Sequence, residues 1–247
     1  LTSVLGCEIA ASSPIEAQKA QAVTSRTFAY HRKKLNSSKL YDMDNTTNNQ
    51  VYRGVESESK PAREAVEKTK DQILTYGIEI GDVPFHANCG GYTEDSGEVW
   101  SGGKKYLKAV PCYWCRDQSH SEWVVEIKKS EIENALTSRG VAVRGIKDIT
   151  TKENSRTGRV MELEISHSDG ELVMNGNKFR LMVGGNVLKS MKYRVRETGD
   201  SFVFSGRGWG HGVGLCQDGA VGMARMGYDY ARILDQYYPE LELTSVE

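Results

Sequence analysis

The segment 206–214 has glycine at every second position, and it constrains the fold of this chain more than any other segment. Because five positions lack side chains, the backbone can approach other groups closely or adopt dihedral angles closed to other residues. The segment lacks the Lys-Ser/Thr ending of a phosphate-binding loop, and no β-α-β pattern of a dinucleotide site follows it. Taken alone, such a run is typical of a tightly packed strand in which His211 has a structural role.

The charges of the chain nearly cancel, because its 247 residues include 32 Lys and Arg against 33 Asp and Glu. This balance argues against a dedicated nucleic-acid binder, whose phosphate contacts require a basic surplus. No uncharged apolar run approaches the ~20 residues that a bilayer span requires. The sequence therefore predicts a soluble globular chain, for which any export signal or membrane anchor would lie outside these residues.

Helical and strand-like segments follow one another without regular alternation, and this mixture predicts the α+β class. We expect a mixed sheet with a long N-terminal helix and C-terminal helices, together with a smaller strand-rich lobe. The whole chain, 1–247, is expected to form a single domain, because no linker separates independent units. A secondary lobe is expected to be inserted within it at about residues 119–192.

The clearest helix is expected over residues 14–35, where small and apolar residues recur with a period of 3.6. Ser13 and Glu16 are spaced as a capping box at its start, which accounts for Glu16 without a catalytic role. A second helix is expected over 61–74, and the Asp-Gly pair at 169–170 predicts a hairpin.

The chain contains five cysteines, an odd number that cannot form intramolecular disulfides only. Two of them form a Cys-x-x-Cys pair with a histidine five residues further on, a spacing that suits a structural zinc site. A disulfide and a redox-active pair are the alternatives. The expected zinc ligands are Cys89, Cys112, Cys115 and His120.

Glu8 has the most suggestive surroundings of the carboxylates, because apolar residues flank it just before the long helix. Partial burial there would raise its pKa and keep it protonated near neutrality, as a general acid requires. His86 and Cys89 also suggest a thiol nucleophile with a nearby base. The alternative for that segment is a strand end with a buried cysteine.

Four segments together resemble the SpoIID/LytB family of bacterial cell-wall proteins. The first contains Glu8 and is similar to the family's GVV-x-x-E-M motif, and the second is similar to EALKAQAVAART. The third reads Phe-His-Ala-Asn-Cys-Gly-Gly-Tyr-Thr, and the fourth is similar to GHGVGMSQYGA. They occur in order along nearly the whole chain, at 5–9, 15–27, 85–93 and 210–220.

The resemblance implies a lytic transglycosylase that cuts peptidoglycan glycan strands between MurNAc and GlcNAc, preferring strands without stem peptides. One glutamic acid would protonate the glycosidic oxygen and then accept a proton from the C6 hydroxyl of the sugar, which closes a 1,6-anhydro ring. A second carboxylate is unnecessary, because the nucleophile belongs to the substrate. The family's catalytic glutamate corresponds to Glu8, with Glu16 as the fallback.

The resemblance also implies a glycan groove lined by hydrogen-bonding and aromatic side chains. Some relatives carry a Cys…His-Cys zinc motif where this chain has Asn48 and Asn49, so zinc here would require the other ligand set. Cys7 and Cys216 are expected to be small residues of the motif segments, and no organic cofactor is expected. The candidate groove residues are Arg26, His86, Thr93, Trp100, Trp209, His211 and Gln217.

Peptidoglycan strands are the implied partner, and the implied location is extracytoplasmic: secreted, periplasmic or anchored to the membrane. The alternative from another class is a non-catalytic glycan-binding protein that enhances a cell-wall amidase, as LytB-type members are described. A hydrolase that uses Cys89 is the third interpretation. Digestion of stripped glycan separates these interpretations, because only the first yields anhydro-sugar ends.

Overall fold

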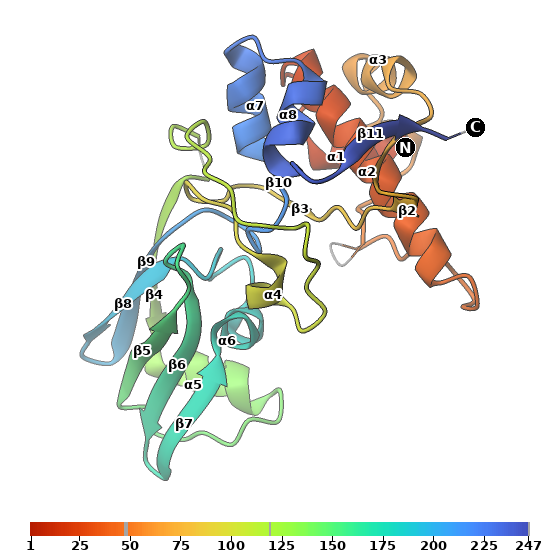
Figure 1. Cartoon of the computed structure of the whole chain (residues 1–247). Helices are drawn as coiled ribbons and strands as arrows, with labels where there is room; N and C mark the ends of the chain where they lie inside the picture. Colours follow the sequence, from red (N-terminus) through yellow and green to blue (C-terminus); the bar gives the residue numbers. More distant parts are fainter. Residues whose placement is uncertain (47–48, 119, 247) are drawn as a thin grey trace.

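The computed structural model describes residues 1–46, 49–118 and 120–246 of the chain. Several helices gather at one end of the molecule and the larger sheets at the other, with two short strands between them (Figure 1). Both chain ends lie at the helical end (Figure 1). This arrangement confirms the α+β class. Asn48, compared above with a zinc motif of relatives, lies outside the described residues.

The long helix α2 forms the centre of the helical end. It spans Ile15–Leu35, as its period predicts, and basic side chains in its last turn suit the negative end of the helix dipole. Its buried face includes Ala17, Ala20 and Ala22, whose small side chains let neighbouring helices approach closely. The other helices of this end are α1 (Thr2–Glu8), η1 (Val55–Ser57), α3 (Lys60–Lys68), α7 (Gln217–Arg225) and α8 (Tyr230–Tyr237).

The start of α2 differs from the expected capping box. Pro14 rather than Ser13 occupies the N-cap position, and no side chain caps the helix. The carboxylate of Glu16 instead accepts a hydrogen bond from the backbone N–H of Tyr230 at 2.9 Å, and Nζ of Lys19 lies 2.6 Å from it. The capping-box prediction is wrong because a tertiary contact with α8 occupies the same carboxylate.

The second expected helix is shorter than predicted. Helix α3 ends at Lys68, and residues expected to continue it form strand β1, Gln72–Tyr76. Asp71, with a φ of 60°, turns the chain between the two elements. Strand β1 pairs antiparallel with β2 (Glu79–Ile80) and with β11 (Glu242–Ser245). Because β11 lies near the opposite end of the chain, local periodicity cannot reveal this pairing.

Two three-stranded antiparallel sheets build the other end of the molecule, with the strand orders β4-β9-β8 and β5-β6-β7. Helices α5 and α6 contact each other and these sheets. The expected hairpin at 169–170 is confirmed as the turn between β6 and β7. The elements are β4 (Glu122–Lys128), α5 (Lys129–Thr137), β5 (Asp148–Asn154), β6 (Val160–His167), β7 (Gly170–Asn175), α6 (Gly176–Val183), β8 (Tyr193–Thr198) and β9 (Ser201–Arg207).

The strand-rich end has its own hydrophobic core, which includes Phe179, Phe202 and Phe204. Because β4 pairs with β9, this unit continues to the end of β9 and extends beyond the expected 119–192. Within the described ranges, the strands form several small sheets rather than one mixed sheet. The assignment of 1–247 to a single domain stays a prediction.

Strands β3 (Phe85–His86) and β10 (Leu215–Cys216) pair in parallel between the two ends (Figure 1). The short helix α4, Ser96–Val99, follows β3. The glycine-rich segment 206–214 leads from β9 into β10, so it connects the strand-rich end to the helical end. This middle part therefore contains two of the four motif segments.

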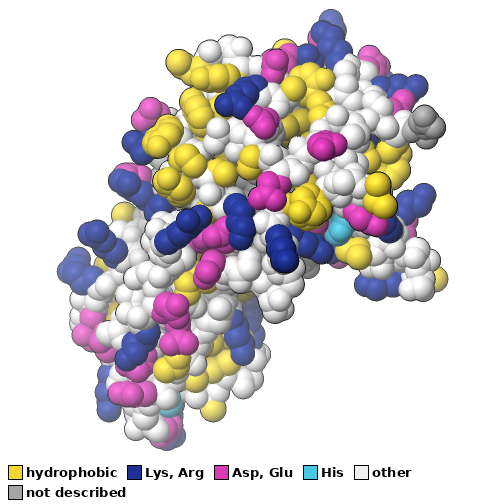
Figure 2. All heavy atoms as spheres, viewed as in Figure 1, with side chains coloured by type: hydrophobic (Ala, Val, Ile, Leu, Met, Phe, Trp, Pro, Cys, Tyr) yellow, Lys and Arg dark blue, Asp and Glu magenta, His cyan; other side chains and the backbone are white. Residues whose placement is uncertain are grey.

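The surface agrees with the balanced composition. Positively and negatively charged side chains are interspersed over the face drawn in Figure 2. Over the described part of the chain, the helices are too short or too polar to traverse a bilayer.

Candidate functional site

Glu8 is the last residue of α1, and its side chain is partly buried. Burial has the largest effect on this carboxyl group and raises the pKa of Glu8 above its ordinary value. Hydrogen bonds from the Val51 backbone and from Gln217 oppose that effect, and the Val51 N–H donates to Oε1 at 3.3 Å. Glu8 therefore has the property that a general acid needs, a proton retained closer to neutral pH.

Gln217 connects the C-terminal motif to the end of α1. It is the first residue of α7, and its Nε2 donates to the backbone carbonyl of Glu8 at 3.0 Å. The same amide nitrogen donates to Oε1 of Gln21 at 3.3 Å. Three of the four motif segments therefore meet beside Glu8, although they are far apart in the sequence.

Arg26 and Thr93 make structural contacts within the protein. The guanidinium of Arg26 donates to the backbone carbonyls of Gln72 at 2.9 Å and Val66 at 3.3 Å, which ties α2 to the region of α3 and β1. Thr93 is buried, and its hydroxyl accepts a hydrogen bond from the backbone N–H of Val110 at 2.7 Å. Both side chains therefore have hydrogen-bond partners within the protein.

His86 and His211 lie together in the middle part, with ring centroids 5.3 Å apart. The backbone N–H of Val213 donates to Nδ1 of His211, so Nε2 carries the proton and donates to the carbonyl of Phe85 at 3.0 Å. Burial lowers the pKa of His211 to about 4 and lowers the pKa of His86 well below its ordinary value. Both rings are therefore neutral at physiological pH and unsuited to act as cations.

Trp100 and Trp209, two of the residues expected to contact glycan, each pack against a histidine ring. Trp100 is 38% exposed, and its ring centroid lies 4.9 Å from that of His211. The ring of Trp209 contacts that of His120, with centroids 5.0 Å apart, and the ammonium group of Lys189 lies 4.7 Å from its centroid. The second contact has the geometry of a cation–π interaction.

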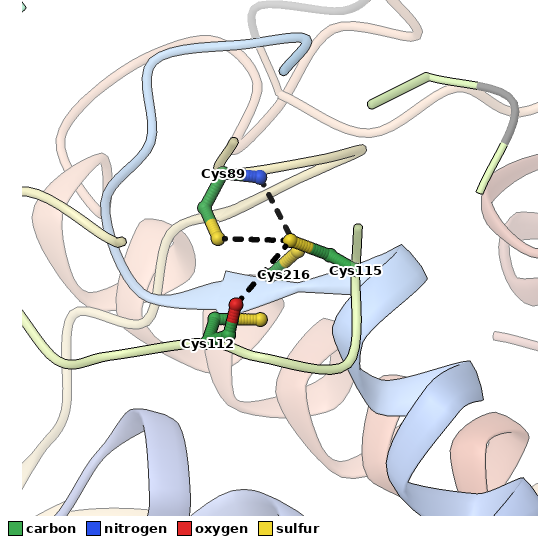
Figure 3. A group of neighbouring side chains, drawn as sticks. All are labelled: Cys89, Cys112, Cys115 and Cys216. Atoms are coloured by element: carbon green, nitrogen blue, oxygen red, sulfur yellow. Dashed lines mark hydrogen bonds between the residues drawn. The ribbon is translucent and has the colours of Figure 1, made fainter. Parts of the chain in front are cut away.

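Four buried cysteines form what we call the thiol group: Cys89, Cys112, Cys115 and Cys216. Their sulfur atoms all lie within 4.8 Å of one another, and none forms a disulfide (Figure 3). Burial raises the pKa of the Cys89 and Cys216 thiols, whereas hydrogen bonds from the neighbouring thiols lower the pKa of Cys115. These four side chains could hold a metal ion.

The thiol group differs in its fourth member from the ligand set expected from the sequence. Cys216 is its fourth member, although the sequence suggested only a small motif residue there. His120 does not belong to it, because its Nδ1 lies 3.2 Å from Oδ2 of Asp218 and its ring contacts Trp209. Cys7 also lies outside the group, in α1. Four of the five cysteines could have suggested this set from the sequence. The histidine close to Cys115, however, was the more obvious fourth ligand than the distant Cys216.

Asn88 connects the thiol group to the glycine-rich segment. Its Nδ2 donates to the carbonyl of Cys115 at 3.0 Å and to Oδ2 of Asp218 at 2.9 Å. Its backbone exchanges two hydrogen bonds with that of Trp209. The thiol group, α7 and Trp209 are therefore held in one network of hydrogen bonds.

A buried ion pair joins the strand-rich end to the middle part, and no sequence pattern indicated it. Nη1 of Arg159 lies 3.6 Å from Oε2 of Glu94, and both side chains are almost fully buried. Nη2 of Arg159 donates to the carbonyls of Cys89 at 2.8 Å and Tyr92 at 2.9 Å. The hydroxyl of Ser155 donates to the same carboxylate at 2.5 Å. This contact fixes the β5–β6 connection against the segment that carries Cys89.

The glycines of 206–214 make room for groups of the protein itself. Gly208 has a φ of 80°, and a Cβ there would lie 2.6 Å from the carbonyl oxygen of Asn88. Gly212 has a φ of 86°, and a Cβ there would lie 2.3 Å from Nη2 of Arg159. The close approach that the sequence predicted is therefore present, but at these two positions it serves internal packing.

Two cavities border the strand-rich end, and one of them also reaches the thiol group. The lining of one, of about 340 Å³, includes Gly90, Cys115, Lys192 and Arg207. The other, of about 570 Å³, shares Lys192 and Arg207 and extends along β4, β8 and β9. Neither lining includes Glu8.

Comparison with protein families gives two matches. A family model described as Stage II sporulation protein, SpoIID, matches residues 1–76. A model described as a domain of unknown function, DUF8618, matches residues 102–214. The first match contains Glu8, and the second covers the whole strand-rich end.

Comparison with individual proteins gives matches along nearly the whole chain. An uncharacterized protein of Brachyspira hyodysenteriae is 32% identical over 97% of this chain and 64% of its own length. The amidase enhancer of Bacillus subtilis is 28% identical over 99% of this chain and 40% of its own length. Stage II sporulation protein D of the same organism is 27% identical over 99% of this chain and 73% of its own length. This chain thus spans less than two thirds of the length of the first two relatives.

Proposed function

The chain belongs to the SpoIID family, and on that premise we propose that it is a peptidoglycan lytic transglycosylase with Glu8 as its general acid and base. The observation that carries this proposal is the setting of Glu8, a carboxyl group whose pKa is raised by burial and whose backbone is held by Gln217. A role at the cell wall agrees with relatives named stage II sporulation protein D and amidase enhancer.

In the proposed reaction, protonated Glu8 gives its proton to the oxygen between MurNAc and GlcNAc while the bond from that oxygen to C1 of MurNAc breaks. The C6 hydroxyl oxygen attacks C1 and closes the 1,6-anhydro ring, and its proton passes to the carboxylate. The enzyme thereby regains its proton and no water is consumed. One carboxyl group is sufficient, unlike in glycosidases that activate water or form a covalent intermediate.

We assign glycan contacts to Trp100 and Trp209, because apolar faces of sugar rings pack against aromatic side chains. His211 supports Trp100 through its ring contact, and its neutral imidazole is already hydrogen-bonded to the backbone. Gln217 has its amide directed at the backbone of Glu8, so we assign it a positioning role. His86, Arg26 and Thr93 are left out of the proposed contact surface because of their internal contacts.

Digestion of glycan strands stripped of stem peptides tests the proposal. The wild-type protein is expected to release fragments with 1,6-anhydroMurNAc ends, detected by mass spectrometry. Glu8→Gln is expected to lower the rate by about 10²-fold to 10⁴-fold, because the amide cannot transfer the proton. Glu16→Gln is the matched control and should keep activity, since that carboxylate is occupied by Tyr230 and Lys19. Full activity of Glu8→Gln would contradict the proposal.

A second candidate function is a glycan-binding enhancer of a cell-wall amidase, which the similarity to the amidase enhancer of Bacillus subtilis favours. Binding to purified glycan that survives Glu8→Gln, with stimulation of an added amidase and without anhydro products, would support it. Loss of cleavage in Glu8→Gln alone would exclude it as the sole function. In both cases the substrate lies outside the cytoplasmic membrane, so we propose an extracytoplasmic location.

The proposal includes one structural zinc ion and no organic cofactor. Four cysteine sulfurs are a common ligand set of structural zinc, and they leave no open position for substrate. The ion would therefore support the fold rather than take part in the proton transfers. The sequence left two alternatives open at Cys112 and Cys115, a disulfide and a reactive pair. Each predicts a number of reactive thiols different from that of a zinc-bound thiol group.

A further inference from the structure

The thiol group has the dimensions of a site for a single metal ion. All four sulfur atoms lie within 4.8 Å of one another, and those of Cys89 and Cys115 are 3.5 Å apart. Sulfur atoms about 2.3 Å from one tetrahedral ion would be about 3.8 Å from each other. An iron–sulfur cluster places several iron and sulfide atoms among its ligands and requires a wider set. The geometry therefore favours a mononuclear site.

Hydrogen-bond donors surround the sulfur atoms. The backbone N–H groups of Cys89 and Gly219 each donate to Sγ of Cys216 at 3.3 Å, and the hydroxyl of Tyr237 lies 3.1 Å from Sγ of Cys112. Partners of this kind orient the ligands of metal sites. A Cβ at Gly219 would lie 2.6 Å from Sγ of Cys112, so this glycine leaves the space that the arrangement needs.

Positive groups lie where a site with several thiolates requires them. Nη2 of the buried Arg159 donates to the carbonyl of Cys89 at 2.8 Å, and Nζ of Lys192 donates to the carbonyl of Gly90 at 3.0 Å. Cys216 is the N-cap of the nine-residue helix α7, whose dipole favours negative charge at that end. Together these groups reduce the free-energy cost of burying thiolates with a divalent ion.

One member of the thiol group directly precedes the residue that holds Glu8. Cys216 ends β10 and Gln217 begins α7, and the side chain of Gln217 donates to the Glu8 backbone. The four thiols come from three separate segments without a disulfide among them. An ion bound to Cys216 would therefore fix the backbone at Gln217 against the two other segments.

We infer that the thiol group binds one tetrahedrally coordinated zinc ion, and that this ion positions Glu8 through Gln217. The first half concerns the four cysteines alone. The second half rests on the proposed function and makes glycan cleavage dependent on a metal that never touches the substrate. Gln217 is then a positioning residue.

Metal analysis of the full chain, purified with a reductant and without chelator, tests the first half. We expect about one zinc ion per chain and, after exchange with Co²⁺, the visible absorption of tetrahedral cobalt thiolate. Cys216→Ser should lose the ion, whereas His120→Ala and Cys7→Ser should retain it. Absence of metal with a Cys112–Cys115 disulfide would overturn this half. Loss of the ion in His120→Ala, with retention in Cys216→Ser, would overturn it as well.

Gln217→Ala tests the second half. This variant should retain one zinc ion per chain but cleave glycan about 10-fold to 100-fold more slowly, because Glu8 loses its positioning contact. Its pH profile should also shift, since the Gln217 hydrogen bond opposes the effect of burial on Glu8. A wild-type rate and an unchanged pH profile would overturn this half.

Hydrogen exchange separates a failure of this inference from a failure of the proposed function. If the wild-type protein cuts no glycan, the zinc and cobalt measurements still decide the first half. The amide of Val51, which donates to the Glu8 carboxylate, reports the second half without activity. Its exchange should become faster in Gln217→Ala while zinc stays bound and the amides of α2 keep their protection. Unchanged exchange of Val51 in this variant would show that Gln217 does not connect the ion to Glu8.

Discussion

The cores of the helical end and of the strand-rich end differ in their small side chains, although both bury large aromatic ones such as Tyr237 and Phe202. The core of the helical end contains many small residues, among them Ala17, Ala20 and Cys112. The core of the strand-rich end contains large ones, such as Phe179 and Phe204. A small side chain removes little apolar area from water when it is buried. Since burial stabilises a fold by about 25 cal/mol per Å² of that area, each such side chain contributes little. We therefore expect the helical end to depend on the zinc ion proposed for the thiol group, and the strand-rich end to be stable through its own core.

Removal of the zinc ion proposed for the thiol group should produce the largest difference in stability between the two ends. Structural zinc sites have apparent binding free energies of about 10–16 kcal/mol, so the helical end should lose most of its stability. Hydrogen exchange followed by mass spectrometry after chelation should show lost protection in α2 and α7 but retained protection in β6 and β9. Equal loss at both ends would contradict the comparison.

Breaking the buried ion pair of Arg159 and Glu94, which joins the strand-rich end to the middle part, should have the next largest effect on stability. Arg159→Met leaves the buried carboxylate of Glu94 without its cation, which should lower the free energy of unfolding by about 3–5 kcal/mol. Urea denaturation monitored by circular dichroism measures this change. The double variant Arg159→Met with Glu94→Leu should recover part of the loss. A double variant no more stable than the single one would argue against a cost from unpaired charge.

Acidification should weaken the middle part. Burial lowers the pKa of His211 to about 4, so between about pH 6.5 and 4 the folded protein binds fewer protons than the unfolded chain. The free energy of unfolding should therefore fall as the pH is lowered through this range, by about 2 kcal/mol. Urea midpoints across the range measure the fall. His211→Gln should reduce the slope, and an unchanged slope would exclude this histidine as its origin.

A small core change confined to the strand-rich end should leave the helical end unaffected. Ile165 is fully buried in β6, and Ile165→Val removes one methyl group from its core. We expect a loss of about 0.5–1.5 kcal/mol in urea denaturation, with unchanged zinc content. A change in zinc content would show that the two ends are coupled more tightly than their separate cores indicate.

An exposed ion pair should have the smallest effect. Nη2 of Arg144 lies 3.3 Å from Oδ1 of Asp169, and both side chains are largely exposed. Arg144→Ala should therefore change the free energy of unfolding by less than about 1 kcal/mol. Thermal denaturation at low and high salt measures the effect. A larger loss would mean that the turn after β6 contributes more to the strand-rich end than its exposure suggests.

Local patterns in the sequence predicted the elements whose causes are local. The period of the long helix and the Asp-Gly turn depend on neighbouring residues, and both predictions are confirmed as α2 and the β6–β7 hairpin. The spacing of Cys112 and Cys115 brought two members of the thiol group together in the sequence itself. Glu8 was selected because apolar neighbours indicated burial, and the structure places it in such a setting.

Where the structure differs from what the sequence led us to expect, contacts between distant segments are the reason. Residues expected to extend α3 form β1, because β11 pairs with them from near the opposite end of the chain. Glu16 binds the backbone of Tyr230 rather than the start of its own helix. His120, though near Cys115 in the sequence, turns toward Asp218 and Trp209.

By itself, the sequence determined the α+β class, the long helix and the likeness to the SpoIID family, and it singled out Glu8 and the cysteines as candidates. Only the tertiary structure decided that Cys216 completes the thiol group and that Gln217 holds the end of α1. It also decided that Arg159 and Glu94 join the strand-rich end to the middle part. The reason is physical: periodicity and capping depend on neighbouring residues, whereas a four-sulfur group or a buried ion pair requires distant segments to pack against each other.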